Sequence, residues 1–377
     1  MTHLERFLAL MEYKPVDRLP NWEVGVWAQT AERWHAEGLN KNSVHWDFFT
    51  GSPEFQMDPR EYIPLNTGMI PAFPVEVISR DDRYETIRNA NGIVTRALQE
   101  GSIGGARMCM DEYIAFPVTC QADFDQLKKR YVSSHPMRLP NYWEDFQLEG
   151  WKRRNHPLVL GQNCSTLGFY WRMREWMGTE NLSYAFYDEP ELCHDMCEFI
   201  ADYTIELVRP LLEKIAPDYI FINEDMAMKS GPLLSPGTYR EFIFPRMKRL
   251  VDFVKGKGVK YVIVDTDGNS EPLIPSLMEA GVDGLWPIER ASDDQDPLAL
   301  RKKYGRDLRI WGAVDKREIV KGPKAISDHL RSLIPMVEDG GFVPTVDHTV
   351  PPDVSLDNFK YYMEKKQHLL RFEFDKI

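Results

Sequence analysis

An Asp-x-Asp pair at the end of an aliphatic run is the clearest chemical signal in the sequence. The stretch KYVIVDTDGN, residues 260–269, is built like a buried strand and then presents Asp265 and Asp267. Alternate residues of a strand point to the same side, so both carboxylates face one way if Asp265 keeps strand geometry. Helix capping before the segment that begins at Ser270 is the alternative, and the turn-forming Asp-Gly pair supports it.

Polar or ionisable residues also end the other aliphatic runs: Glu23, Asn163, Glu224 with Asp225, Glu289, Asp315, and Asp347 with His348. Carboxylates gathered in one place raise each other's pKa unless a cation or hydrogen-bond donors compensate. The series therefore indicates an active site. The Asp-x-Asp pair together with His348 favours a metal or acid/base site, although His348 alone has a structural alternative, packed under the Pro-Pro turn that follows it.

A parallel sheet would bring these strand ends together. From about residue 155, short aliphatic runs alternate with longer amphipathic segments, which is the pattern of repeated βα units. The expected strands are 157–163, 218–225, 260–267, 283–289, 308–315 and 341–348, with a further one at 18–25 after an opening helix. Seven candidates predict a (β/α)8 TIM barrel, in which the chemistry lies at the C-terminal strand ends.

Residues 1–377 are expected to form a single barrel domain with an insertion at about 50–150. Within the insertion, residues 75–98 indicate a hairpin around Asn-Ala-Asn-Gly. The eighth strand is expected near this region. No Pro/Gly/Ser linker flanks the insertion, so it is predicted to form a rim or lid of the barrel.

Composition restricts the classes of partner. The formal charge is −12, from 46 basic and 58 acidic residues, and no basic block is present. This argues against nucleic acid and anionic membrane surfaces. No apolar run approaches the roughly 20 residues that span a bilayer, and the N-terminus does not resemble a signal peptide. The expected location is cytoplasmic. Five cysteines without a CxxC pair fit reduced thiols, and Cys193 and Cys197, one helical turn apart, fit a buried helix face.

Several stretches together resemble the uroporphyrinogen decarboxylase superfamily. They are RFLALMEYKPVDRLPNWE, DEPELCHDMCEFIADYTIELV, SGPLLSPGTYREFIFPRMKRL, WGAVDKREIVKG and GGFVPTVDHTVPPDVSLDNFKYYM. The resemblance implies one (β/α)8 barrel. It also implies either a porphyrinogen decarboxylase or a methyltransferase that works with a corrinoid protein. The decarboxylase branch carries an N-terminal Arg-Gln-x-Gly-Arg motif, whereas this chain has NWEVGVWAQTAERW in its place, without an arginine before Arg33.

The corrinoid-dependent methyltransferase branch is closer in character. Its zinc-dependent members carry His-x-Cys-Gly-Asn where this chain has Asp265-Thr266-Asp267-Gly268-Asn269, and a later Cys near the position of His348. The Gly-Asn framework matches while the expected ligands differ. Either the metal site is rebuilt with oxygen and imidazole ligands, which zinc accepts, or it is lost.

The resemblance and the strand ends together suggest transfer of a methyl group from a small O-methylated substrate, an aromatic ether being one option, to the corrinoid of a partner protein. Zinc or another metal on Asp265, Asp267 and His348, with Glu224 as a fourth ligand, would polarise the substrate oxygen. Asp225 or Asp347 would protonate the leaving oxygen. The candidate substrate contacts are Trp22, Glu23, Trp27, Asn163, Tyr170, Glu289 and Asp315. Core packing is the alternative for at least half of the aromatic residues.

Two other functions stay open from the sequence. One is a decarboxylase-type lyase, against which the missing arginine motif counts, and the other is a non-catalytic barrel that binds a corrinoid or tetrapyrrole. The sequence leaves the oligomeric state open, a homodimer being one option.

Overall fold

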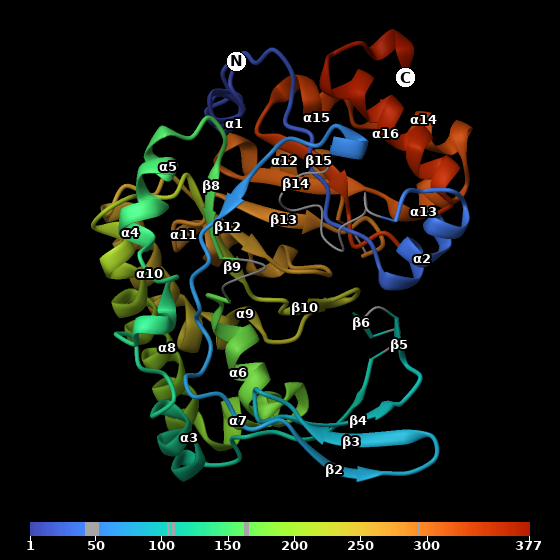
Figure 1. Cartoon of the computed structure of the whole chain (residues 1–377). Coiled ribbons are helices and arrows are strands. Elements are labelled where there is room, and N and C mark those ends of the chain that lie inside the picture. Colours follow the sequence, from blue (N-terminus) through green and yellow to red (C-terminus); the bar gives the residue numbers. More distant parts are fainter. Residues whose placement is uncertain (42–52, 104–105, 108–109, 162–165, 293–294) are drawn as a thin grey trace.

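A curled parallel sheet forms the centre of the molecule (Figure 1). The computed structural model describes residues 1–41, 53–103, 106–107, 110–161, 166–292 and 295–377. Within these residues the sheet has the order β1 (Glu61–Tyr62), β8 (Leu158–Leu160), β9 (Tyr219–Asn223), β12 (Tyr261–Asp265), β13 (Gly284–Ile288), β14 (Arg309–Val314) and β15 (Phe342–Val346). All neighbouring pairs are parallel. The fold is the predicted (β/α)8 barrel, and the strands of this sheet from β8 onward lie within the expected ranges.

Residues 19–26 close the barrel between β15 and β1. On one side, the amide of Asp58 donates to the carbonyl of Asn21 at 2.8 Å, and on the other Val26 forms a parallel bridge with Val350. The segment expected as a strand at 18–25 therefore fills a strand position without a regular ladder. β1 provides the eighth position, close to the region in which the sequence predicts an eighth strand.

Aromatic rings fill the barrel where the strands begin. Phe7 of α1 (His3–Met11) lies 5.0 Å from Tyr219 and 5.6 Å from Trp22 between ring centroids, and Trp22 lies 5.8 Å from Trp311. Tyr219 is the first residue of β9, so this cluster marks the N-terminal end of the barrel. Burying each large ring stabilises the fold by roughly 1.5–3 kcal/mol. The opposite, C-terminal end is left for a site.

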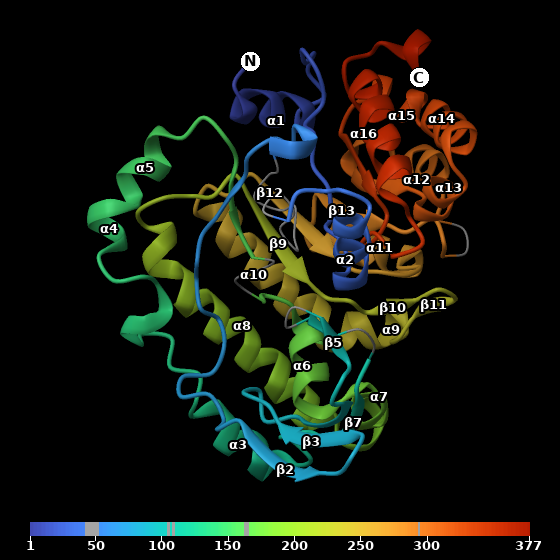
Figure 2. The same cartoon turned by 45° about the vertical axis from the view of Figure 1, so that its right-hand side comes forward.

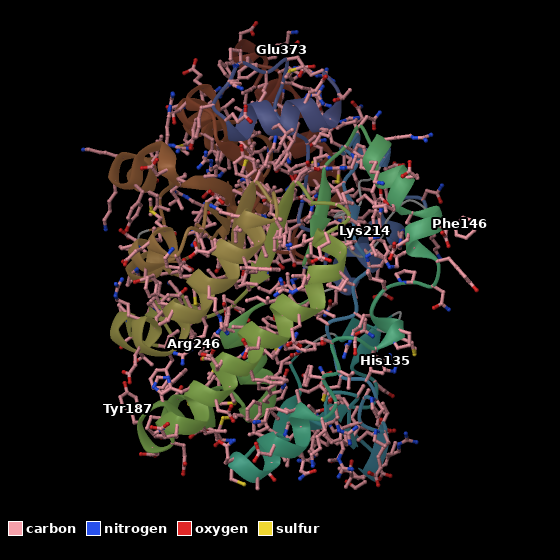
Figure 3. The ribbon with its side chains drawn as sticks, turned by 90° about the vertical axis from the view of Figure 1, so that its left-hand side faces the viewer. His135, Phe146, Tyr187, Lys214, Arg246 and Glu373 are labelled. Atoms are coloured by element: carbon pink, nitrogen blue, oxygen red, sulfur yellow. The ribbon has the colours of Figure 1, made fainter. Side chains whose placement is uncertain are left out.

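Helices cover the outside of the barrel. They are α6 (Phe169–Met177), α7 (Thr179–Asp188), α8 (Pro190–Leu212), α10 (Phe244–Gly256), α11 (Ile274–Glu279), α12 (Pro297–Tyr304), α13 (Lys316–Val320), α14 (Pro323–Ser332), α15 (Ile334–Asp339) and α16 (Leu356–Leu370). Figure 3 shows this layer from the side, with Arg246 of α10 beside α8. There Arg246 bonds Glu198 at 2.8 Å. Cys193 and Cys197 lie on the buried face of α8, which confirms that prediction.

The insertion contains an antiparallel sheet of its own. Within the described residues its order is β2 (Glu76–Arg80), β3 (Tyr84–Arg88), β4 (Val94–Leu98) and β7 (Glu112–Ala115), and the predicted hairpin is the β3–β4 pair. Figures 1 and 2 both place this sheet beside α6 and α7. The amide of Val118 donates to the carbonyl of Trp176 at 3.0 Å, which ties the end of β7 to α6.

Smaller elements connect these parts. Around the sheets lie the helices α2 (Ala28–Ala36), α3 (Gln121–Lys128), α4 (Trp143–Phe146), α5 (Leu148–Arg153) and α9 (Pro236–Thr238), and the short strands β5 (Ser102–Ile103), β6 (Ala106–Arg107), β10 (Ala227–Met228) and β11 (Gly231–Pro232). Ser235 caps α9 by accepting from the amide of Thr238, and Pro236 takes the first helical position. Among the described residues, no helix is both long enough and apolar enough to cross a membrane.

Candidate active site at the C-terminal mouth of the barrel

A cavity of about 520 Å³ opens where β9, β12 and β13 end. This volume lies within the roughly 300–1,000 Å³ typical of small-molecule sites. Strand ends and loops supply Val24, Asn223, Asp265, Asp267, Trp286, Pro287, His348 and Thr349. The insertion, the segment leading into α6, and α6 itself supply Asn66, Thr67, Gly68, Asn91, Tyr131, Thr166, Trp171, Arg172 and Glu175. The cavity thus has one wall from the barrel and one from the insertion with α6.

The barrel wall carries a carboxylate and imidazole cluster. Asp265 is the last residue of β12, and its Oδ2 accepts from Asn223 Nδ2 at 2.8 Å. Asp267 follows in the loop, with its Oδ2 3.4 Å from His348 Nε2. The sequence-predicted triad of Asp265, Asp267 and His348 therefore lines one cavity. Trp27, another predicted contact, stacks on the His348 ring at a centroid distance of 6.3 Å, although the side chain of Trp27 is 42% exposed.

Burial and neighbouring charge shift the pKa values of this cluster in a consistent direction. Burial and the charge of Asp267 raise the pKa of Asp265 well above its ordinary value, against the hydrogen bond from Asn223. For His348, burial lowers the pKa, but the hydrogen bond and charge of Asp267 outweigh it, so the pKa is raised. The surroundings of Asp265 therefore favour its protonated form, whereas Asp267 faces the imidazole.

The opposite wall is built around Arg172, which lies on a helix and is therefore absent from the strand-end residues predicted from the sequence. Its side chain is 3% exposed. Nη2 donates to the carbonyl of Thr166 at 2.7 Å, and Nη1 donates to the hydroxyl of Tyr131 at 3.3 Å. Glu175, one turn further along α6, also lines the cavity, and burial raises its pKa against the opposing effect of Arg172. The sequence signal for Arg172 is a charged residue on the helix stripe of Phe169 and Trp176, spaced by three and four residues.

Trp22, Glu23 and Tyr170, predicted as substrate contacts, do not line this cavity. Trp22 belongs to the aromatic cluster at the other end of the barrel. Glu23 is fully buried and bonds Lys366, and Tyr170 is 1% exposed within the core. Trp22 and Glu23 lie away from the cavity because alternation along a strand gives the side of the sheet and not the depth within the barrel, and Tyr170 is one of the buried residues of α6.

Glu224 caps a helix and does not point at the predicted metal position. Its two carboxyl oxygens accept from the amides of Phe169 and Tyr170 at 3.1 and 2.6 Å, at the N-terminus of α6. Burial raises the pKa of Glu224 to about 7 against these amides. A carboxylate at a helix N-terminus satisfies unpaired amides, which explains the position. Glu224 thus holds α6, and with it Arg172, against the end of β9.

The two predicted proton donors are held by other groups. Asp225 bonds Arg174 at 2.7 Å. Asp347 is fully buried, and its oxygens accept from the amides of Arg290 at 2.8 Å and Lys316 at 3.1 Å. Burial raises the pKa of Asp347 to about 6. Both carboxylates therefore position loops at the mouth.

Glu289 and Asp315 lie near the mouth without lining the main cavity. Glu289 bonds Lys316 at 2.9 Å and accepts from the amide of Gly268 at 3.2 Å, which supports the turn after Asp267. Asp315 caps α13 by accepting from the amide of Arg317 at 2.8 Å. Asn163 falls outside the described residues.

The fit of a metal can be judged from the donor set. Throughout the parts of the chain that the structure describes, no group of three or more His, Cys, Asp or Glu side chains could hold a metal ion. Asp265 shares its carboxyl with Asn223, Glu224 is committed to α6, and only Asp267 and His348 approach each other. The expected four-ligand zinc site does not fit these residues, so zinc is not assigned to them.

Comparisons with known proteins agree with this architecture. A family model described as uroporphyrinogen decarboxylase (URO-D) matches residues 169–368. A uroporphyrinogen decarboxylase from Picosynechococcus sp. is 22% identical over 56% of this chain and 61% of its own length. A methylated-thiol–coenzyme M methyltransferase from Methanosarcina mazei is 24% identical over 42% of this chain and 40% of its own length.

A solved structure extends the likeness to the whole chain. It is a methyltransferase from Methanosarcina mazei, with a TM-score of 0.61, 16% identity, and coverage of 100% of this chain and 99% of that one. At this identity the likeness shows a shared fold. The curated relatives are matched over only 61% and 40% of their lengths, so their activities are not transferred by the comparison. The family model spans more than half of the 377 residues, and the chain therefore belongs to the uroporphyrinogen decarboxylase family.

Proposed function

We propose that the protein is a methyltransferase that moves a methyl group from a small O-methylated substrate to the corrinoid of a partner protein. One observation carries the proposal: Asp265, Asp267 and His348 line the same cavity as Trp171 and Trp286. Aromatic walls suit an aromatic ether, and a protonated carboxyl beside them suits its oxygen. The two relatives named as methyltransferases support the reaction class.

The chain's own residues supply the proton that the reaction needs. When the methyl group leaves, the electron pair of the C–O bond stays on the oxygen, which must be protonated. Burial and the charge of Asp267 raise the pKa of Asp265, which favours the protonated form that a proton donor needs. We therefore assign the role of proton donor to Asp265, in place of Asp225 and Asp347, which the sequence predicts. The reduced corrinoid on its partner supplies the nucleophile that accepts the methyl group.

The remaining residues orient the substrate. Asp267 holds the His348 ring at 3.4 Å, and Trp27 stacks on its face. Asn223 fixes the Asp265 carboxyl at 2.8 Å. A carboxyl held by a neighbouring amide loses little freedom when it meets the leaving oxygen, which is the advantage of a preorganised site.

The test is demethylation of methoxylated aromatics with a reduced corrinoid protein, followed by the cobalt absorption change and by the demethylated product. Asp265→Asn should lower the rate by roughly 10²–10⁴-fold, the usual contribution of general acid catalysis. Its melting temperature should stay near that of the wild type, because Asn keeps the side-chain volume. His348→Gln should also lower the rate, while Arg153→Met, at an 82% exposed side chain on α5, serves as the control. An unchanged rate for Asp265→Asn removes it from the mechanism.

A decarboxylase is the second candidate, favoured by the relative from Picosynechococcus sp.. The same assay separates the two reactions. Release of CO₂ from a carboxylate substrate without any corrinoid protein would favour the decarboxylase. Binding of a free corrinoid without turnover of any substrate would favour a non-catalytic corrinoid-binding protein.

A further inference from the structure

Arg172 is a buried cation without a carboxylate partner. Its side chain is 3% exposed, and among the described residues no carboxylate oxygen lies within 4.0 Å of its guanidinium. Its two hydrogen bonds go to neutral oxygens, those of Thr166 and Tyr131. Nε is buried and has no hydrogen-bond partner within the described part of the chain.

The neighbouring arginine in the same helix shows the contrast. Arg174 bonds both the carbonyl and the carboxylate of Asp225, the latter at 2.7 Å, and its side chain is 23% exposed. Burying a charge without a counterion costs several kcal/mol. The more deeply buried arginine is thus the one without a carboxylate in direct contact, and it is also the one that lines the cavity.

The surroundings of Arg172 fit a planar anion. Tyr131 receives hydrogen bonds at its hydroxyl oxygen from Arg172 and from Trp176 Nε1, at 3.3 and 2.9 Å, so its own O–H can donate to a ligand. Asn66 and Asn91 line the same wall. Glu175 lines the same wall and its charge acts on Arg172, so it competes with a bound anion; burial raises the pKa of Glu175 against the opposing effect of Arg172.

We propose that Arg172 holds a carboxylate of the substrate, so that the methyl donor is an aromatic O-methyl ether that also carries a carboxylate group. The inference rests on the proposed function for the ether and on Arg172 for the carboxylate. The ring then lies between Trp171 and Trp286, with the acid toward Arg172 and the methoxy group toward Asp265. Arginine favours carboxylates because its planar N–H groups match both oxygens.

The experiment measures binding without any corrinoid protein. Wild type, Arg172→Met and Arg172→Lys are titrated with a methoxybenzoate, with the matched methoxybenzenesulfonate, and with the neutral methoxybenzyl alcohol. Arg172→Met should weaken methoxybenzoate binding by roughly 30- to 4,000-fold, the usual effect of removing one partner of a buried charge pair. Binding of the neutral alcohol should change less than threefold. Arg153→Met should match the wild type for each ligand.

Thermal melts of the ligand-free proteins separate this role from a structural one. If the role of Arg172 is to bind an anion, Arg172→Met should melt within a few degrees of the wild type, because the loss of two hydrogen bonds is offset by removal of a buried charge that has no carboxylate in contact. A melting temperature lowered by many degrees, with methoxybenzoate affinity retained in the folded fraction, would overturn the proposal. So would equal binding of methoxybenzoate to wild type and both variants. Tighter binding of the sulfonate than of the carboxylate would overturn the carboxylate assignment.

Failure of this inference and failure of the proposed function give different results. If methoxybenzoate binds in an Arg172-dependent way but no methyl group reaches the corrinoid protein, the anion subsite stands and the methyltransferase function fails. If neutral methoxybenzenes are demethylated while methoxybenzoate neither binds nor reacts, the function stands and the anion subsite is overturned.

Discussion

Lys366 and Glu23 form a fully buried ion pair, and removing one partner should be costly. Both side chains are 0% exposed. Glu23 also accepts from the hydroxyl of Tyr362 at 2.5 Å and from the amide of Val346 at 2.8 Å, while Lys366 donates to the carbonyl of Trp22 at 2.6 Å. The pair therefore joins α16 to the segment that closes the barrel. Burial lowers the pKa of Lys366 against the raising effect of Glu23, which reflects the cost of the buried charge.

Lys366→Met leaves the Glu23 carboxylate buried without its cation, with only the hydrogen bonds from Tyr362 and Val346. Breaking a buried pair in this way costs about 3–5 kcal/mol. A chain of 377 residues has an unfolding entropy of about 0.8 kcal/mol/K, from about 2.1 cal/mol/K per residue, so the melting temperature should fall by about 4–6 °C. The double variant Glu23→Gln, Lys366→Met should melt closer to the wild type than either single variant, because no unpaired charge remains.

Thermal melts and the methyl transfer assay together decide between two roles for Glu23. Lys360→Met, at an exposed position of α16, is the control and should leave the melting temperature unchanged. If Lys366→Met melts at the same temperature as the wild type, breaking the Lys366–Glu23 pair does not cost the expected ~3–5 kcal/mol. If it melts like the wild type and loses methyl transfer, Glu23 belongs to the active site, as the sequence predicts.

Three further predictions concern the mouth and the insertion. Burial raises the pKa of Asp347 from 3.8 to about 6. The neutral form of Asp347 therefore stabilises the fold fully below about pH 3.8, and this stabilisation is lost as the pH rises through about 6. In urea unfolding from pH 4 to 7, the free energy of unfolding of Asp347→Asn should rise by about 3 kcal/mol relative to that of the wild type. If the two proteins show the same dependence of this free energy on pH, the prediction is contradicted. Gly168→Ala should cost more than about 3 kcal/mol, because its Cβ would lie 1.5 Å from the carbonyl oxygen of Asn223, whereas Gly150→Ala, with open space around it, should be near neutral in the same melts. Limited proteolysis should not release residues 50–150 as a stable folded fragment; recovery of such a fragment would show an independent domain.

The barrel wall of the site could be predicted from the sequence because strand ends are encoded locally. The run ending at Asp265 and the run ending before His348 are both aliphatic and both stop at ionisable residues. Parallel strands place their C-terminal ends at one edge of the sheet, so these side chains meet without any knowledge of the loops. Asp265, Asp267 and His348 duly line one cavity.

The local sequence did not encode how deep in the barrel a side chain lies or which residue it contacts. The sequence shows that Trp22 and Glu23 lie in an extended segment, but which end of the barrel they reach depends on Phe7 of α1 and Lys366 of α16. These partners are separated from residues 22–23 by 15 and 343 positions respectively. Glu224 likewise ends a strand, and only the packing of α6 against β9 turns it into a helix cap.

The sequence by itself determined the alternation of strands and helices, the hairpin at 75–98, and the strand-end carboxylates, because periodicity and turn residues act over a few neighbours. The tertiary structure alone decided that Arg172 faces the same cavity as Asp265. These two residues come from α6 and β12, whose approach depends on the cap by Glu224 and on the contact of Gly168 with Asn223. A buried arginine indicates a ligand only when its surroundings are known, because whether a carboxylate lies in contact with it depends on the packed interior and not on the local sequence.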